Sequence, residues 1–180
     1  NGASLALYLG DVAGNVYSVG GADGALHWRA HLNDHPDATI TGSPRLYNGR
    51  LFVPMSSREW ATAADPTYAC CTFRGGVVAF DAADGKMLWK SYSIPEKPED
   101  TGKRNPLDVP IIGPSGAPVW NSPTVDVQRG LLYVGTGESY TSPAHGNSDA
   151  VLAFDIDTGK LVWSKQLTAH DAWNMSCFIG

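Results

Sequence analysis

Two adjacent cysteines, Cys70 and Cys71, are the residues of this sequence whose types and spacing most directly suggest chemistry. A disulfide between neighbours would close almost no loop, so it would remove little entropy from the unfolded chain and would make a poor structural staple. Strained linkages of this kind persist mostly where function supports them. The alternative is a pair of free cysteines packed as small hydrophobic side chains. A third cysteine, Cys177, is left over, so the cysteines give only weak evidence for an oxidising compartment.

Composition limits the classes of partner. The 180 residues carry a formal net charge of -5, and the basic residues are scattered, which argues against nucleic acid and anionic membrane surfaces as partners. No apolar stretch is long enough to span a bilayer. The 20 glycines and 12 prolines favour many short strands and tight turns over long helices. Because the sequence begins in mid-repeat, we interpret it as a mature segment or a fragment, in which a missing targeting sequence carries no information.

An internal repeat gives the elements that must position the cysteines. Residues 14–28, 76–89 and 149–163 each predict a short strand, a turn containing glycine, and a second strand that ends in tryptophan. Residues 43–53 and 122–134 predict two further hairpins, each preceding one of the later tryptophan hairpins.

Paired hairpins make four-stranded sheets, and such sheets repeated along a chain are typical of the blades of an all-β propeller. We expect about three four-stranded antiparallel blades, the first incomplete at its front, so that residues 1–180 form part of a larger propeller domain. A β-sandwich is the alternative, but it would not explain three matching hairpins. Long polar connections separate the hairpins, and we interpret residues 95–108 within them as surface decoration.

The repeats, the cysteine pair and the segment 170–174 resemble a known family. The tryptophan hairpins are similar to the docking repeats of quinoproteins, which are eight-bladed propellers that hold pyrroloquinoline quinone (PQQ). The string from Tyr68 to Gly75 is similar to the polyvinyl-alcohol dehydrogenase branch of the PQQ-dependent alcohol dehydrogenases. The resemblance covers nearly the whole chain, about three of the eight blades. Tryptophan hairpins alone are weakly specific, because cofactor-free propellers of the outer-membrane assembly scaffold type share them.

The resemblance implies a cofactor site. Cys70 and Cys71 would form a disulfide against one face of the flat quinone, and Trp120 would stack on the opposite face. Thr41 and Ser56 occupy positions where the family has hydroxyls that reach the cofactor. Pro118 stands where methanol-oxidising relatives carry a hydrogen-bonding threonine, so that contact is expected to be missing.

The resemblance also implies a calcium site beside the quinone. Glu59 and Glu138 follow apolar strand patterns of two blades, and calcium prefers several hard oxygen ligands. Methanol-oxidising relatives usually have asparagine at the second position. Asn174 could add an amide oxygen. Solvated surface glutamates are the alternative interpretation.

The catalytic base is where the sequence departs from the family pattern. In the family a carboxylate accepts the alcohol proton while hydride passes to the quinone, but the motif that ends in Trp-Asp in relatives ends here in Trp173-Asn174. A neutral amide cannot accept that proton. Asp171 is the carboxylate we favour. The alternatives are His170, a residue beyond 180, or a different mechanism in this branch of the family.

The function that follows from the resemblance is a periplasmic PQQ- and calcium-dependent dehydrogenase. It would oxidise secondary or polymeric alcohols, such as polyvinyl alcohol, and pass electrons to a cytochrome c. The alternatives are a non-enzymatic propeller scaffold and a carbohydrate-binding module using Trp60 and Tyr140. The scaffold would have no use for the cysteine pair. The sequence holds no Cys-x-x-Cys-His haem motif.

Overall fold

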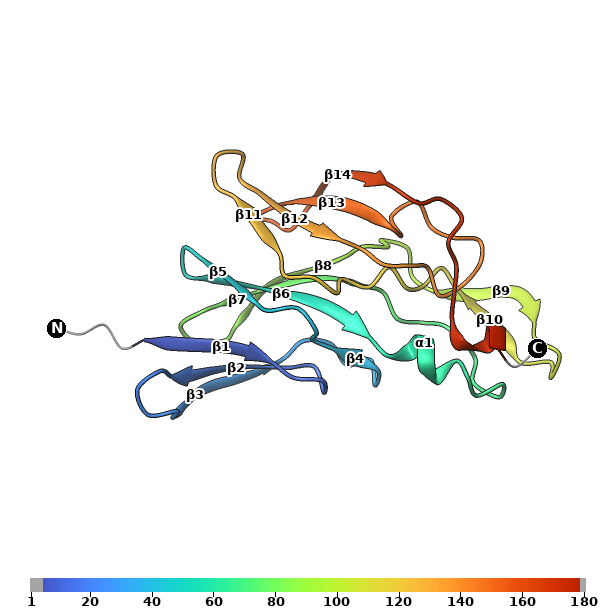
Figure 1. The fold of residues 1–180 in the computed structure, drawn as a ribbon, viewed down its shortest axis with the longest axis horizontal. Helices are drawn as coiled ribbons and strands as arrows, with labels where there is room; N and C mark the ends of the chain where they lie inside the picture. Colours follow the sequence, from blue (N-terminus) through green and yellow to red (C-terminus); the bar gives the residue numbers. More distant parts are fainter. Residues whose placement is uncertain (1–4, 179–180) are drawn as a thin grey trace.

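A computed structural model describes residues 5–178 of the chain. Three antiparallel sheets lie one upon another, with the first repeat at one side of the stack and the third at the other (Figure 1). The first sheet comprises β1 (Ala6–Gly10), β2 (Asn15–Gly20) and β3 (Leu26–His31). The second comprises β4 (Ala38–Thr39), β5 (Arg45–Tyr47), β6 (Arg50–Ser57), β7 (Gly76–Asp81) and β8 (Met87–Tyr92). The third comprises β11 (Thr124–Asp126), β12 (Leu131–Gly135), β13 (Ala150–Asp155) and β14 (Leu161–Gln166).

The predicted hairpins and turns are present. β5 and β6 meet at a two-residue turn in which Asn48 and Gly49 both have positive φ (47° and 73°), as a tight hairpin with the right twist requires. The third sheet has the order β11-β12-β13-β14, and the first has three strands. The expectation of an all-β fold built from four-stranded blades, the first one incomplete, is therefore confirmed.

Tryptophans and glycines dock neighbouring sheets. The Trp28 indole Nε1 donates a 3.0 Å hydrogen bond to the backbone oxygen of Ala82 in the turn of the next blade. A Cβ added at Gly85 would lie 2.6 Å from the Trp28 ring, and one added at Gly159 would lie 2.6 Å from the Trp89 ring. Only glycine permits this approach, and both glycines also have positive φ. Trp163, the third repeat tryptophan, is 42% exposed.

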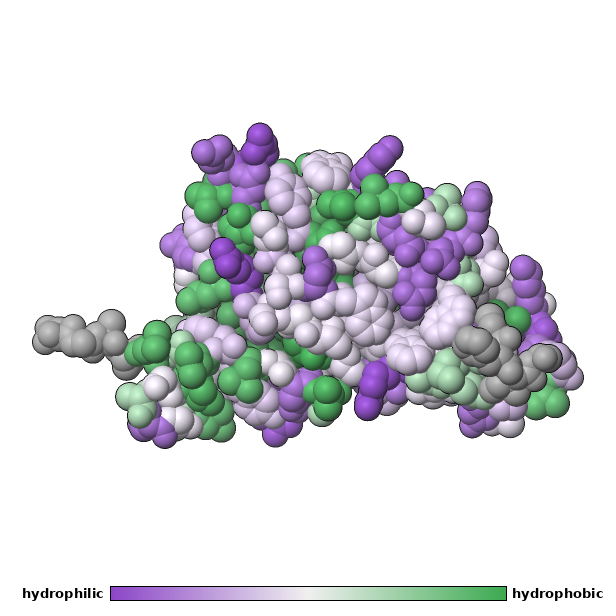
Figure 2. Space-filling model, viewed as in Figure 1, coloured by the Kyte–Doolittle hydropathy of each residue, from purple (hydrophilic) through white to green (hydrophobic). Residues whose placement is uncertain are grey.

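Two apolar layers fill the spaces between the sheets. One surrounds Leu51, Val53 and Phe80 and reaches the first sheet through Val16 and Trp28. The other, with Phe52 and Val77 on the second sheet and Leu132 and Phe154 on the third, joins those two sheets. Successive side chains of a strand point to opposite faces, so the apolar residues of β6 pack alternately into the two layers. Figure 2 shows apolar side chains over the first sheet, where Leu7 and Leu9 of β1 are exposed.

Three shorter elements lie in the connections at the end of the stack where β6 ends (Figure 1). They are the helix α1 (Glu59–Thr62), the hairpin of β9 (Glu99–Arg104) and β10 (Pro110–Gly113), and the 3₁₀ helix η1 (Met175–Phe178). Residues 95–108 are largely exposed, as expected of surface decoration, but they include β9, which pairs with β10, and β10 holds the cysteine segment, as described below. None of the helices within residues 5–178 is long and apolar enough to cross a membrane.

Candidate functional site

Backbone pairing gathers four distant segments at this end of the stack. Arg74 bridges to Gly116 in a parallel sense, Gly116 bridges to Ser139 in an antiparallel sense, and Ser139 bridges to Ala172 in a parallel sense. The ladder continues through Gly116 N–H to Phe73 O (2.8 Å) and Trp173 N–H to Ser139 O (2.8 Å). Most predicted site residues lie within a few positions of one of these bridged residues, so the bridges bring them to the same end of the stack.

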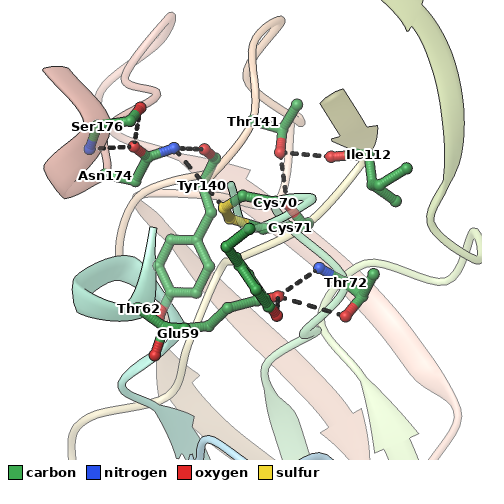
Figure 3. The surroundings of a disulfide bond; sticks show 12 residues. Glu59, Thr62, Cys70, Cys71, Thr72, Ile112, Tyr140, Thr141, Asn174 and Ser176 are labelled. Carbon is green, nitrogen blue, oxygen red and sulfur yellow. Dashed lines mark hydrogen bonds between the residues drawn. A yellow bond between two sulfur atoms is a disulfide. The ribbon is translucent and has the colours of Figure 1, made fainter. Parts of the chain in front are cut away.

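Cys70 and Cys71 form a disulfide, as predicted. The backbone of Ile112 in β10 holds the pair on one side, since Ile112 N–H donates to Cys70 O (2.7 Å) and Cys71 N–H donates to Ile112 O (3.0 Å). Figure 3 shows the two sulfur atoms between this contact and the side chain of Asn174. The Asn174 Nδ2 lies 4.0 Å from the Cys70 sulfur and donates a 2.7 Å hydrogen bond to Tyr140 O. Two elements from outside the cysteine loop thus fix the disulfide.

The Glu59 carboxylate is fully buried and is surrounded by protein donors. Its Oε1 accepts hydrogen bonds from Tyr68 Oη (2.8 Å), Thr72 N–H (2.7 Å) and Thr72 Oγ1 (3.3 Å), and its Oε2 accepts one from Phe73 N–H (2.8 Å). His35 Nε2 lies 3.4 Å from Oε1. Burial alone would raise the pKa of the Glu59 carboxyl, but the hydrogen bonds, that of His35 foremost, outweigh it and lower the pKa below its ordinary value.

Glu138 has a different environment. Burial raises the pKa of its carboxyl, and the negative charges of Asp149 and Asp171 add to the shift, against a hydrogen bond from the residue's own backbone N–H. Asp171 is exposed, and its backbone oxygen accepts a 3.2 Å hydrogen bond from Ser139 N–H. Burial and the charge of Asp171 also raise the pKa of Asp149. Asp171, the predicted base, therefore lies within electrostatic reach of Glu138.

Tyr140 connects the two predicted metal-binding glutamates. Burial raises the pKa of this fully buried phenol, and the carboxylates of Glu138 and Glu59 both contribute to the increase. The ring of Tyr140 stacks on Phe73 at 6.4 Å between centroids, and Phe73 meets His35 edge-on at 5.5 Å. The two glutamates thus belong to one end of the fold and not to opposite rims.

Trp120 and Thr41 lie in contact. The Thr41 hydroxyl donates a 3.2 Å hydrogen bond to the backbone oxygen of Trp120, and Ser43 N–H donates a 2.9 Å bond to Ser122 Oγ. A Cβ at Gly137 would lie 2.6 Å from the Trp120 Nε1. Glycine at 137 therefore lets the indole lie against the chain that leads to Glu138.

Ser56 carries a buried hydroxyl without a hydrogen-bond partner. Its register partner across β4 and β6 is Thr39, whose hydroxyl is equally unpartnered, and the two residues are 0% and 1% exposed. Opposite residues in a sheet direct their side chains to the same face. Most buried hydroxyls in proteins have a partner, so two adjacent exceptions mark a place where a polar ligand or water would bind.

A cavity of about 650 Å³ opens beside the disulfide. Its polar wall includes Asn174, Thr141 and Ser142, and its apolar wall includes Leu107 and Ile111 of the β9–β10 hairpin region. Cys70 lies in its lining. The volume is typical of small-molecule pockets, which are mostly apolar with a few polar groups.

The described donors do not form a complete metal site. Within residues 5–178, no three His, Cys, Asp or Glu side chains are grouped so that they could hold a metal ion. Both carboxylate oxygens of Glu59 already accept hydrogen bonds from protein donors. The Asn174 Oδ1 accepts hydrogen bonds from the backbone N–H (2.8 Å) and the hydroxyl of Ser176. The carboxylate of Glu138 is repelled by the negative charges of Asp149 and Asp171, and a cation beside it would reduce that repulsion.

Sequence reasoning missed three contributors to this region. They are Thr39, the β10 strand that holds the disulfide, and Tyr140 as the link between the glutamates. The charged segment that precedes β10 gave no signal, because its pattern is typical of a solvated loop.

The stacked four-stranded sheets, together with a disulfide of neighbouring cysteines at the loop end, define the chain as a segment of a quinoprotein-type β-propeller. Residues 9–177 match the family model for the glucose/ethanol/alcohol dehydrogenase β-propeller domain. The chain belongs to this family of PQQ-dependent dehydrogenases.

Similar proteins agree with this assignment. The chain is 39% identical to polyvinylalcohol dehydrogenase from a Pseudomonas species over 97% of its length, and 41% identical to that from Sphingopyxis sp. (strain 113P3) over 98%. It spans 27% of the length of each of these relatives. The resemblance to the polyvinyl-alcohol dehydrogenase branch is confirmed. The scaffold alternative is not favoured.

Solved structures show the same architecture. Quinohemoprotein alcohol dehydrogenase ADHIIG from Pseudomonas putida HK5 matches with a TM-score of 0.71 and 26% identity, covering 94% of this chain and 26% of that one. The quinohemoprotein alcohol dehydrogenase from Comamonas testosteroni matches with a TM-score of 0.70 and 26% identity, covering 94% and 27%.

Proposed function

We propose that this chain is part of an enzyme that uses PQQ to oxidise alcohols, with secondary or polymeric alcohols such as polyvinyl alcohol as substrates. The observation that carries the proposal is the identity of 39% and 41% to two polyvinylalcohol dehydrogenases over almost the whole chain. It is supported by the disulfide of neighbouring cysteines beside a cavity of small-molecule size.

The roles proposed for the residues follow from their surroundings. Trp120, held by Thr41 and Gly137, would offer an indole face to a flat cofactor, and the Cys70–Cys71 disulfide would exclude water from another side. The buried Ser56 hydroxyl, which has no partner, would bond a polar group of the cofactor. PQQ, when bound, supplies the two-electron acceptor that no side chain provides.

Asp171 is the group that we propose to accept the proton of the alcohol hydroxyl at its carboxylate. Its side chain is exposed, and its charge is felt by Glu138. Asn174, an amide, would orient groups near the disulfide and would not take a proton. We propose that calcium binds beside Glu138, with further ligands from outside the described residues.

We propose the cavity beside Cys70 as the chamber for the alcohol. Its apolar wall suits a carbon chain, and its hydroxyl and amide wall suits the alcohol groups along that chain. We further propose a cytochrome c as the electron acceptor and the periplasm as the compartment. A disulfide is typical of an oxidising compartment, which supports the second of these.

The test is reconstitution of the complete protein. The metal-stripped apoprotein is mixed with PQQ and calcium, and reduction of an artificial dye is followed with polyvinyl alcohol, a small secondary alcohol and a small primary alcohol. We expect turnover that requires PQQ and calcium and that favours the first two substrates. Failure of the complete protein to take up PQQ would refute the proposal.

A further inference from the structure

Glu59 is placed to organise the cysteine loop. Its donors come from both sides of the disulfide: Tyr68 lies two residues before Cys70, and Thr72 and Phe73 directly follow Cys71. The carboxylate is 0% exposed. One side chain therefore holds both ends of the segment that carries the two sulfur atoms, while Ile112 holds its middle from the other side (Figure 3).

The number of donors leaves little room for a metal. An ionised carboxylate offers about four lone-pair positions. Four hydrogen bonds are formed at distances of 2.7 to 3.3 Å, and His35 Nε2 approaches within 3.4 Å. A cation on this carboxylate would have to displace the buried backbone N–H groups of Thr72 and Phe73, and these groups would then be left without partners.

His35 is fixed as a donor toward this carboxylate. Asp37 N–H donates a 3.2 Å hydrogen bond to His35 Nδ1, so in the neutral imidazole the proton is on Nε2. Nε2 lies 3.0 Å from Thr72 Oγ1 and 3.4 Å from Glu59 Oε1. The backbone near Asp37 thus sets the tautomer that completes the ring of donors around Glu59.

We propose that Glu59 is a positioning residue, which together with His35 fixes the Tyr68–Phe73 segment and the orientation of the Cys70–Cys71 disulfide, and that it is not a metal ligand. This role differs from the calcium ligand that the sequence predicts at Glu59. It follows from contacts within the chain and does not depend on catalysis. It gives the disulfide a support on the side opposite β10.

The test compares Glu59→Gln with Glu138→Gln in the complete protein. Two quantities are measured: the rate at which mild dithiothreitol releases labelable thiols at Cys70 and Cys71, and the affinity for calcium by titration calorimetry. In Glu59→Gln, one carboxylate oxygen becomes an amide that donates, so one backbone N–H facing it loses its acceptor. We expect thiol release at least tenfold faster, with calcium affinity unchanged within twofold.

Glu138→Gln is the matched control, and we expect it to leave the rate of thiol release unchanged. An unchanged release rate in Glu59→Gln would overturn the proposal, and so would a tenfold loss of calcium affinity in that variant. Neither measurement uses turnover. An inactive protein that still shows faster thiol release in Glu59→Gln would count against the proposed function and not against this inference.

A milder variant keeps the test decisive if Glu59→Gln does not fold. Tyr68→Phe removes a single donor to Glu59 and retains the ring. We expect thiol release to be about threefold faster. Tyr133→Phe, which removes a hydroxyl bonded to Asp126 of β11, should have no effect. Equal rates in the two tyrosine variants would contradict the role of Glu59.

Discussion

Trp28 and Ala82, 54 positions apart in the chain, are joined by a 3.0 Å hydrogen bond from the indole Nε1 to the backbone oxygen. Trp28→Phe removes this donor, but Tyr8 Oη still donates a 3.1 Å hydrogen bond to the same oxygen, so we expect the free energy of unfolding to fall by roughly 0.5–1.5 kcal/mol. Denaturant unfolding of the complete protein measures the change. Trp163→Phe is the control, because Trp163 is 42% exposed, and we expect an effect within about 0.5 kcal/mol. Equal losses in the two variants would contradict the docking role of Trp28.

Ser56→Ala separates folding from cofactor binding. Removal of a buried hydroxyl without a partner should stabilise the apoprotein by roughly 1 kcal/mol, while the affinity for PQQ falls. The neighbouring Ser57→Ala is the control. Ser57 Oγ accepts a 2.8 Å hydrogen bond from Glu59 N–H, so its loss should destabilise the protein. Thermal unfolding and PQQ titration check both expectations, and unaltered PQQ affinity in Ser56→Ala would remove Ser56 from the cofactor site.

Glu138 should make stability depend on pH in a recognisable direction. Burial and neighbouring carboxylates raise the pKa of its carboxyl in the folded state, so ionisation is more costly there than in the unfolded chain. The penalty is absent below the ordinary pKa of the unfolded glutamate and grows as pH rises through the folded pKa. Glu138→Gln should therefore raise the midpoint of unfolding at pH 7 and have little effect near pH 3, measured without calcium.

The control for Glu138 has the opposite sign. A hydrogen bond from Arg129 lowers the pKa of the Asp126 carboxyl, so Asp126 contributes stability above its unfolded pKa that is lost as pH falls through the folded pKa. Asp126→Asn should lower the midpoint at pH 7 and have little effect at low pH. A Glu138→Gln variant that is less stable at neutral pH would show that its carboxylate has a partner in the folded chain.

Asp171→Asn tests the proposed base. Loss of a positioned general base typically lowers turnover by about 10²–10⁴-fold, so we expect kcat in the complete protein to fall by that order with little change in PQQ affinity. His170→Gln is the matched control and should retain most of the activity. A larger loss in His170→Gln than in Asp171→Asn would assign the proton transfer to the imidazole.

Leu107→Glu tests the chamber. Leu107 is 58% exposed and belongs to the apolar wall of the cavity beside Cys70, so a charge there should weaken contact with a carbon chain. We expect KM for polyvinyl alcohol to rise several-fold and KM for a small alcohol to change less. Leu26→Glu, at a site on β3 that is similarly exposed at 60%, is the control. Equal KM changes for both alcohols would argue against an extended binding site.

Much of the fold could be predicted from the sequence because its signals are local. The turn at Asn48 and Gly49 needs positive φ at both residues, and the tryptophan hairpins recur with glycine at the same place, so strand pairs and blades followed directly. The β9–β10 hairpin could not be predicted. The residues of β9 are mostly charged or polar and are exposed. The hairpin contacts the cysteine loop through the backbone of Ile112, and a backbone contact leaves no mark in the pattern of side chains.

The candidate site shows the limit of predicting roles from residue types. The sequence picked out Glu59 as a candidate ligand, but residue type alone cannot distinguish a buried glutamate surrounded by hydrogen-bond donors from one that binds a cation. The donors are backbone N–H groups and a histidine 24 positions earlier, and only the folded chain brings them to the carboxylate.

The bridges from Arg74 through Gly116 and Ser139 to Ala172 also bear on the order of events during folding. Each of these bridges joins positions far apart in the sequence, and no single blade contains all of them. The entropy lost on closing the intervening loops must therefore be overcome before any bridge can form. The hairpins can therefore form early by themselves, whereas the loop end takes its shape only in the last association of the sheets. We therefore expect a slow final phase of folding, which should be visible in the near-ultraviolet signal of the aromatic residues at the loop end.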